Sequence, residues 1–273
     1  MKFAMKTLVA TAAFVAAGVA NANSVSLLAN GTVTESGYTL SDLIGTDTLT
    51  FSSTLIGALN AGKVQVAGVA PATTTVTYKT NAATKVVSIS SASAAAPVTS
   101  LSADLTGTTL TVTGAGTAGG SLQSALTTNI STTGGSLKIL NLSVDLTARK
   151  VYADLVGANG VGTRNNVWLW DIATVTGPTA LDLSLASAGG GVMSLTNTRS
   201  GLTINPAAFD LFATAMGLTA NGITSLKTVT DFGTIVSTVS LKVTPAVPEP
   251  STYALMGLGL AGLGLAARRR RAR

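Results

Sequence analysis

The side chains that could carry chemistry in this chain are few and widely spaced. The 273 residues include no histidine and no cysteine. Histidine is the side chain best suited to proton transfer near neutral pH and the commonest metal ligand. Acid–base chemistry would therefore depend on carboxylates, which in pairs can hydrolyse glycosidic bonds. The carboxylates between the two ends of the chain are scattered through it: Glu35, Asp42, Asp47, Asp104, Asp145, Asp154, Asp171, Asp182, Asp210 and Asp231.

Sequence patterns that mark catalytic or cofactor sites are also scarce. Serine is abundant, but the chain has no Gly-x-Ser-x-Gly elbow and no histidine to act as a base. Gly114 to Gly119 has the spacing of a dinucleotide-binding loop, but its surroundings are strand-like rather than alternating strand and helix. No calcium-loop spacing is present. We expect a protein that is not an enzyme and that uses no metal or cofactor.

Trp168 and Trp170 form the most distinctive pair in the central region. In a regular strand, Trp168, Trp170 and Ile172 would share one face, and two indoles side by side offer a flat apolar platform for sugar rings. Val167 and Leu169 make the other face apolar as well, which is typical of a strand covered on both sides. We expect both tryptophans in the core, with a carbohydrate contact through Trp168 and Trp170 as the alternative.

The last 27 residues combine a short motif, an apolar run and a basic end. The motif is Val247-Pro248-Glu249-Pro250, whose prolines favour extended backbone. The run 253–267 carries no charge, and in lipid its backbone amides could be satisfied only by a helix. The basic residues that follow the run are Arg268, Arg269, Arg270, Arg271 and Arg273. Basic residues beside a span are retained on the cytoplasmic side of a membrane.

The apolar run is short for a permanent anchor. At about 1.5 Å per residue it would extend roughly 22 Å as a helix, less than the ~30 Å hydrocarbon core of a bilayer. Its glycines also lower its helix propensity. A plain anchor is the alternative, but we expect a transmembrane sorting helix that is removed after use.

Motif, apolar run and basic end in this order resemble a PEP-CTERM sorting tail, over residues 245–273. Such tails occur on proteins exported by Gram-negative bacteria that make extracellular polysaccharide. The resemblance implies recognition by an exosortase, a membrane transpeptidase thought to cut near the Pro-Glu-Pro element. It implies transient anchoring in the inner membrane, followed by delivery to the cell surface or the extracellular space. The implied partners are the exosortase and the secretion machinery.

The first 22 residues have the pattern of a secretory signal peptide. Lys2 and Lys6 form a basic start, residues 8–19 an apolar centre, and Ala20-Asn21-Ala22 a small-x-small cleavage site. We expect cleavage after Ala22.

Charge is concentrated in the two end segments. The formal net charge is +6, but these segments hold seven of the 17 basic residues, which leaves ten Lys/Arg against ten Asp/Glu in residues 23–247. A neutral body lacks the basic surface that nucleic-acid binding requires. We expect no nucleic-acid partner, and extracellular polysaccharide remains a candidate partner.

The body, residues 23–244, has the patterning of a mainly β protein. Alternating or strand-like segments occur at 73–78, 86–90, 109–113, 140–146, 150–155, 181–185 and 237–243. Residues 140–155 predict a hairpin. One helix is predicted at 206–216, with Asn205 as cap and Gly217 as stop, and a weaker one at 121–127. We expect an antiparallel β-sandwich-like body, with a candidate subdivision at the Gly/Ala/Thr run 114–120.

These features predict an exported, non-catalytic structural or adhesive protein of the cell envelope or extracellular matrix. The first alternative is a carbohydrate-binding module. The order of hairpin, tryptophan strand, helix and final strand is also similar to some bacterial surface β-sandwich modules that bind haem. Those modules use tyrosine or histidine near the iron, and the body retains only Tyr38, Tyr78 and Tyr152. A haem-binding module and an enzyme are the weaker alternatives.

Overall fold

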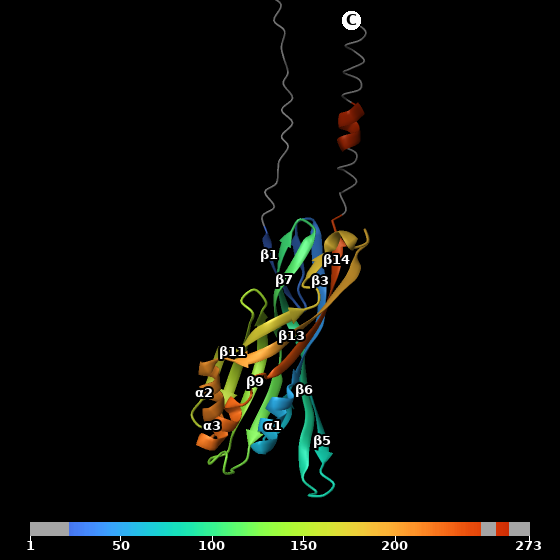
Figure 1. The fold of residues 1–273 in the computed structure, drawn as a ribbon. Helices are drawn as coiled ribbons and strands as arrows, with labels where there is room; N and C mark the ends of the chain where they lie inside the picture. The colour runs from blue at the N-terminus through green and yellow to red at the C-terminus, as the bar shows by residue number, and fades with distance from the viewer. Residues whose placement is uncertain (1–21, 247–254, 262–273) are drawn as a thin grey trace, which may run out of the picture.

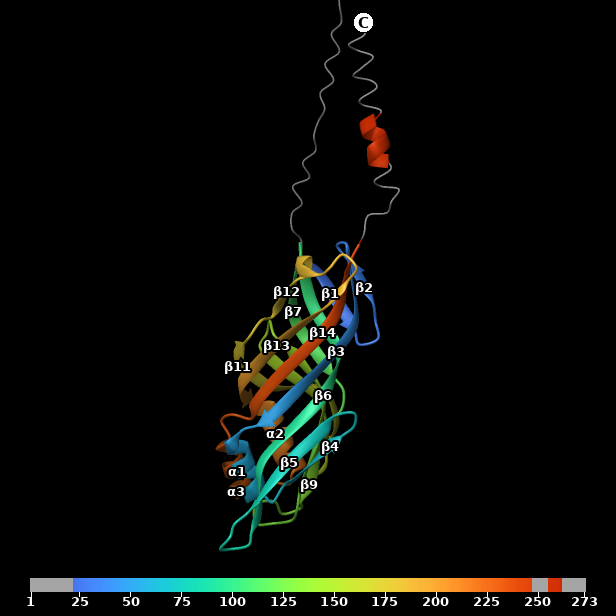
Figure 2. The same ribbon diagram turned by 90° about the vertical axis from the view of Figure 1, so that its right-hand side faces the viewer.

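The computed structural model describes residues 22–246 and 255–261. Residues 22–246 form an elongated antiparallel sheet with three α-helices at one end (Figures 1 and 2). The strands are β1 (Asn23–Leu28), β2 (Val33–Glu35), β3 (Tyr38–Phe51), β4 (Gln65–Val69), β5 (Thr73–Thr80), β6 (Val87–Thr106), β7 (Thr109–Thr117), β8 (Gly120–Ala125), β9 (Gly135–Asp145), β10 (Lys150–Gly157), β11 (Gly162–Thr176), β12 (Ala180–Asp182), β13 (Gly191–Ile204) and β14 (Gly233–Pro245). The helices are α1 (Ser53–Ala61), α2 (Pro206–Ala215) and α3 (Ala220–Lys227), with a short 3-10 turn, η1, at Leu183–Leu185.

The sheet closes on itself. Its strand order is β12-β7-β6-β3-β14-β13-β11-β10-β9-β8-β4, and an additional antiparallel pairing joins β7 to β9. The long strand β6 also pairs with β1 and β5 along different parts of its length. The predicted mainly β, antiparallel body is therefore confirmed, and its two facing layers are opposite walls of one continuous sheet.

Glycines permit the close approach that completes this closure. Gly114 and Gly116 lie opposite Asp145 and Ser143 of β9. A Cβ atom at Gly114 would lie 2.7 Å from the carbonyl oxygen of Val144, closer than such atoms can approach. The Gly/Ala/Thr run 114–120 thus forms the end of β7 and the start of β8, where two strands meet closely.

Two apolar cores lie along the interior. The helical-end core joins the helices to the sheet and includes Phe51, Leu59, Trp170 and Phe232. The terminal-end core lies between the strands at the other end, where β1 begins and β14 ends, and consists of aliphatic residues such as Leu27 and Leu110 (Figure 1).

Local signals account for the helices. Asn205 caps α2 by accepting a hydrogen bond from the Ala207 amide, and Gly217 follows with φ of +59°, so the predicted helix at 206–216 is confirmed. The sequence analysis missed α1 and α3, which Ser52 and Thr219 cap in the same way.

The weaker helix predicted at 121–127 is wrong. Residues 120–125 form β8, paired along its whole length with β9 on one side and through residues 120–124 with β4 on the other. Pairing on both edges outweighed a weak helical pattern. The hairpin of 140–155 is confirmed as β9 and β10, and the other predicted strands lie in β5, β6, β7, β12 and β14, although residues 183–185 turn into η1.

Candidate functional site

Most residues of the predicted sorting segments lie outside the described part of the chain. These are Ala20, Val247, Pro248, Glu249, Pro250, Arg268, Arg269, Arg270, Arg271 and Arg273. Ala22 is exposed directly before β1, and β14 ends at Pro245, two residues before the motif. Residues 255–261 of the apolar run are helical, with exposed side chains. No helix within the described residues is both long and apolar enough to cross a membrane.

Trp168 and Trp170 lie on opposite faces of β11. The register with β10 pairs Trp170 with Val151 but Trp168 with Tyr152, so that Leu169 is an extra residue, a β-bulge. Trp170 is 2% exposed and Leu169 is fully buried. The expectation that Trp168 and Trp170 share a face is wrong, because the bulge reverses the alternation between them. Trp170 belongs to the core, whereas Trp168 is partly buried on the outer face.

The outer face around Trp168 carries aromatic and charged groups together. The Lys150 ammonium lies 3.5 Å from the centroid of the Trp168 ring, a cation–π contact. Tyr152 lies opposite Trp168 on the neighbouring strand. Lys150 is paired in register with Asp145 on one side and Asp171 on the other. We call these five residues the Trp168 strip.

A larger outer surface is rich in hydroxyl groups, with Ala95, Pro97 and Val236 interrupting its rows. It consists of rows of residues that are paired in register across β5, β6, β3, β14, β13 and β11. These strands lie side by side in Figure 2. We define the hydroxyl face as Thr46, Thr48, Thr50, Thr73, Thr75, Ser93, Thr174, Thr176, Ser194, Thr196, Thr198, Ser200, Thr234, Thr238 and Ser240. All of these side chains are exposed or partly exposed.

The rows of the hydroxyl face are regular. One row reads Thr46–Thr238–Thr196 across β3, β14 and β13. The hydroxyls of Thr196 and Thr238 are 3.3 Å apart, and those of Ser194 and Ser240 are 2.7 Å apart. Neighbouring strands lie about 4.8 Å apart and alternate residues about 6.8 Å apart. The result is a repeating grid of groups that both donate and accept hydrogen bonds. The hydroxyl face could have been predicted from the sequence, because threonine occupies every second position in segments such as residues 46–50.

The opposite side of the same strands carries a buried polar cluster between the two cores. Asp47 and Arg199 are each about 1% exposed, and their charged groups are 3.6 Å apart. Asn197 and Ser237 lie beside them in register and are also buried. We call these four residues the polar waist. Asp47, Leu49 and Phe51 all point inward from β3. A carboxylate at a position where the alternation predicts an apolar side chain is unusual. Asp47 could therefore have been recognised from the sequence.

Burial dominates the electrostatics of the polar waist. Loss of solvation raises the pKa of Asp47 above its ordinary value, although the nearby charge of Arg199 acts in the opposite direction. The same loss of solvation lowers the pKa of Arg199. The attraction between the two charges therefore does not offset the cost of burying them. Among the described residues, no group of three or more Asp, Glu, His or Cys could hold a metal ion.

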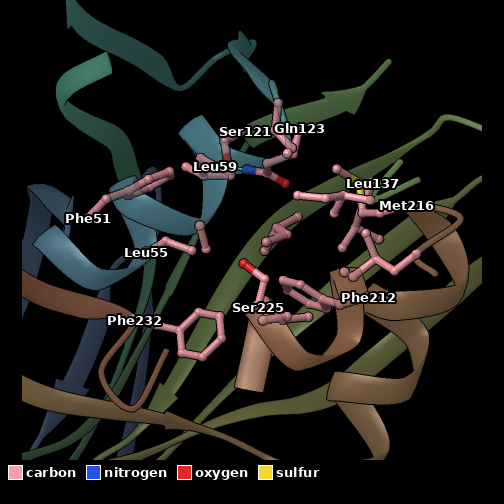
Figure 3. Close-up of a pocket in the computed structure, with 18 of the residues that line it drawn as sticks. Phe51, Leu55, Leu59, Ser121, Gln123, Leu137, Phe212, Met216, Ser225 and Phe232 are labelled. Atoms are coloured by element: carbon pink, nitrogen blue, oxygen red, sulfur yellow. Dashed lines mark hydrogen bonds between the residues drawn. The ribbon is translucent and has the colours of Figure 1, made fainter. Parts of the chain in front are cut away.

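An apolar cavity of about 80 Å³ lies under the helices (Figure 3). Its walls come from α1, α2, α3 and the inner faces of β3, β8, β9 and β11. The polar side chains among the lining residues are Ser121, Gln123 and Ser225. None of the described lining residues is charged. The sequence analysis missed this cavity because its walls come from segments far apart in the chain.

The comparison with family models confirms the identity of the tail. Residues 246–271 match the PEP-CTERM protein-sorting motif. No curated protein and no solved structure matches the chain. The motif covers about a tenth of the chain, and it marks an exported protein that exosortase sorts to the cell surface.

Proposed function

We propose that the body is a non-catalytic structural or adhesive component of the extracellular matrix that attaches to neutral polysaccharide through the hydroxyl face. The single observation that carries this proposal is the grid of Ser and Thr side chains, without a charged residue in its rows, across six neighbouring strands.

The chemistry of the face fits a hydroxyl-bearing polymer. A hydroxyl both donates and accepts, so it can pair with a sugar hydroxyl in either sense. Threonine and serine lose little rotamer freedom on binding compared with lysine or glutamate. A single hydrogen bond contributes only about 0.5–1.5 kcal/mol, so attachment would rely on many weak contacts along an extended chain.

The position of the face relative to the tail fits this role. β14 ends at Pro245, at the terminal end of the body, whereas the hydroxyl face extends along the strands toward the helices (Figures 1 and 2). These strands would be accessible to polymer both before the tail is removed and afterwards.

The test is co-sedimentation of the purified exported protein with insoluble cellulose and chitin, which are neutral, and with calcium alginate beads, which are acidic. The test variant is Thr46→Val, Thr196→Val and Thr238→Val together, which keeps β-branched side chains and removes one row of hydroxyls. We expect binding to the neutral polymers to weaken about tenfold or more. The matched control is Thr80→Val, Thr106→Val and Thr109→Val, exposed strand threonines outside the face. Equal loss in both variants would contradict the proposal.

The second candidate function is sugar binding at the Trp168 strip. The observation in its favour is the partly exposed Trp168 ring beside Tyr152, with Lys150 over the ring and Asp145 and Asp171 in register with Lys150. Here Trp168→Ala would abolish binding of soluble oligosaccharides, measured by calorimetry, while the threonine variant would retain it. Loss of binding in the threonine variant, with binding retained in Trp168→Ala, would instead favour the hydroxyl face.

Removal of the tail is a further part of the proposal. The motif 246–271 supports processing by exosortase near Val247 to Pro250. Intact-mass analysis of the exported protein should show a C-terminus close to that motif. Recovery of a surface protein that ends at Arg273 would contradict processing.

A further inference from the structure

The cavity under the helices presents polar atoms to an otherwise apolar space. Gln123 is 8% exposed, and its amide nitrogen donates to the Ser121 hydroxyl at 2.8 Å. That bond orients the amide, and the Gln123 Oε1 atom has no hydrogen-bond partner among the described residues. The buried Trp170 Nε1 also has none there. Figure 3 shows Gln123 and Ser225 facing the same space.

These atoms differ in kind from the rest of the cavity wall. Buried polar atoms are nearly always hydrogen-bonded, because leaving one unpaired costs free energy. Gln123 Oε1 is an acceptor, and an occupant with a hydroxyl group can donate to it. Since the lining side chains carry no charge, the occupant must be neutral.

The size of the cavity limits the occupant further. A cavity of about 150 Å³ in another protein binds benzene, and this one is about 80 Å³. By that comparison it holds roughly three or four non-hydrogen atoms. Leu55, Leu59 and Phe212 line it with hydrocarbon, which favours an alkyl body.

We propose that this cavity is a binding site for short, uncharged aliphatic molecules that carry a hydroxyl group. The alkyl body packs between α1, α3 and the sheet, and the hydroxyl donates to Gln123 Oε1. This site is independent of the hydroxyl face, and it adds small-molecule binding to a body proposed to be adhesive.

Trp170 is a built-in reporter of this site. In the full chain carrying Trp168→Phe, Trp170 is the only remaining tryptophan. Its fluorescence would be followed during titration with ethanol, 1-propanol, 1-butanol and 1-hexanol. We expect a saturable change whose dissociation constant falls about fourfold from ethanol to 1-propanol and improves no further at 1-butanol and 1-hexanol. A linear, unsaturable response would overturn the proposal.

Two variants separate the cavity from the hydrogen bond. Ala58→Leu places extra carbon in the cavity and should abolish saturation, whereas Ala61→Leu, an exposed position near the end of the same helix, should leave it intact. Gln123→Met keeps the side-chain length and should weaken 1-propanol binding up to tenfold. Retained saturation in a folded Ala58→Leu protein would place binding elsewhere. Unchanged affinity in Gln123→Met would refute the role of the hydroxyl pairing.

Discussion

The two cores of this molecule are built from one sheet but filled in different ways. All buried residues of the terminal-end core are aliphatic, namely leucine, valine and alanine. The helical-end core contains Phe51, Trp170 and Phe232, and helices contribute part of its wall. The Trp170 and Phe232 rings are 6.1 Å apart, and Phe212 meets Phe232 edge to face at 6.3 Å.

The difference lies in what fills the interior. The buried side chains that fill the terminal-end core are those of leucine, valine and alanine alone. At the helical end, helices and large aromatic rings share the interior. The cavity lies among these rings and helices.

The polar waist marks the change from one core to the other. On β3 the inward side chain of Asp47 comes before Leu49 and Phe51 of the helical-end core, and Val239 of the terminal-end core lies one inward position beyond Ser237 on β14. Buried polar groups of this kind favour one register of the strands over its alternatives. We infer that the waist keeps the long strands β3, β13 and β14 in register.

The largest expected effect comes from breaking the polar waist that separates the cores. Asp47→Ala leaves the Arg199 guanidinium buried without its partner, and should lower the free energy of unfolding by about 3–5 kcal/mol. Asp47→Ala with Arg199→Met removes both charges and should recover most of that loss. Urea denaturation of the wild type and both variants measures this. A double variant as unstable as the single one would show that the charge itself is not the cause.

The next effect compares a leucine from each core. Leu110 is fully buried in the terminal-end core, whereas Leu59 is 8% exposed and borders the cavity. Leu110→Ala should cost about 3–5 kcal/mol, and Leu59→Ala about 2–3 kcal/mol, because a side chain beside a void has fewer contacts to lose. Both losses in unfolding free energy are measured by urea denaturation. The dependence of that free energy on urea concentration should be the same in both variants as in the wild type. Equal losses would mean that the two cores are packed alike.

The same contrast explains what could be predicted from the sequence. Residues 140–146 and 150–155 alternate strictly, so one face of each strand was evident, and their hairpin is confirmed. The helix at 206–216 has its own cap and stop, so its prediction needed no distant contact. Both features are local.

Features that depend on distant contacts could not be predicted. The bulge at Leu169 reverses the face of Trp168 relative to Trp170, and it arises from the register with β10 rather than from a residue type that marks bulges. The cavity combines residues from Leu49 to Phe232. Closure of the sheet depends on Gly114 meeting β9, and glycines in a Gly/Ala/Thr run are equally typical of a loop.

The pH dependence of stability tests the electrostatics of the waist. The pKa of Asp47 is raised in the folded protein above its ordinary value of 3.8, chiefly by burial. The folded state therefore holds the proton more tightly than the unfolded chain. The stabilisation that results is complete below pH 3.8 and is lost as the pH rises through the folded pKa.

Asp47→Asn lacks this titration and provides the comparison. From pH 3.8 upward, the wild type should lose stability relative to Asp47→Asn by at most about 1.4 kcal/mol per pH unit. Urea denaturation of both proteins in steps from pH 3 to pH 8 gives the difference. A wild type that instead gains relative stability as the pH rises would show that Arg199 keeps the carboxylate ionised.

The smallest expected effect is confined to the helical end. Asn205 accepts a hydrogen bond from the Ala207 amide at 2.9 Å and so satisfies one unpaired donor at the start of α2. Asn205→Ala should lower the free energy of unfolding by about 1 kcal/mol. The matched control is Asn221→Ala, an exposed asparagine inside α3 that caps no helix, where alanine should be neutral or stabilising by about 0.5 kcal/mol because of its higher helix propensity. Amide hydrogen exchange should place the change from Asn205→Ala in α2 and the neighbouring cavity wall, and leave protection in the terminal-end core unaltered. Loss of protection in both cores would instead mean that they unfold as one unit, and that their different packing does not give them separate stabilities.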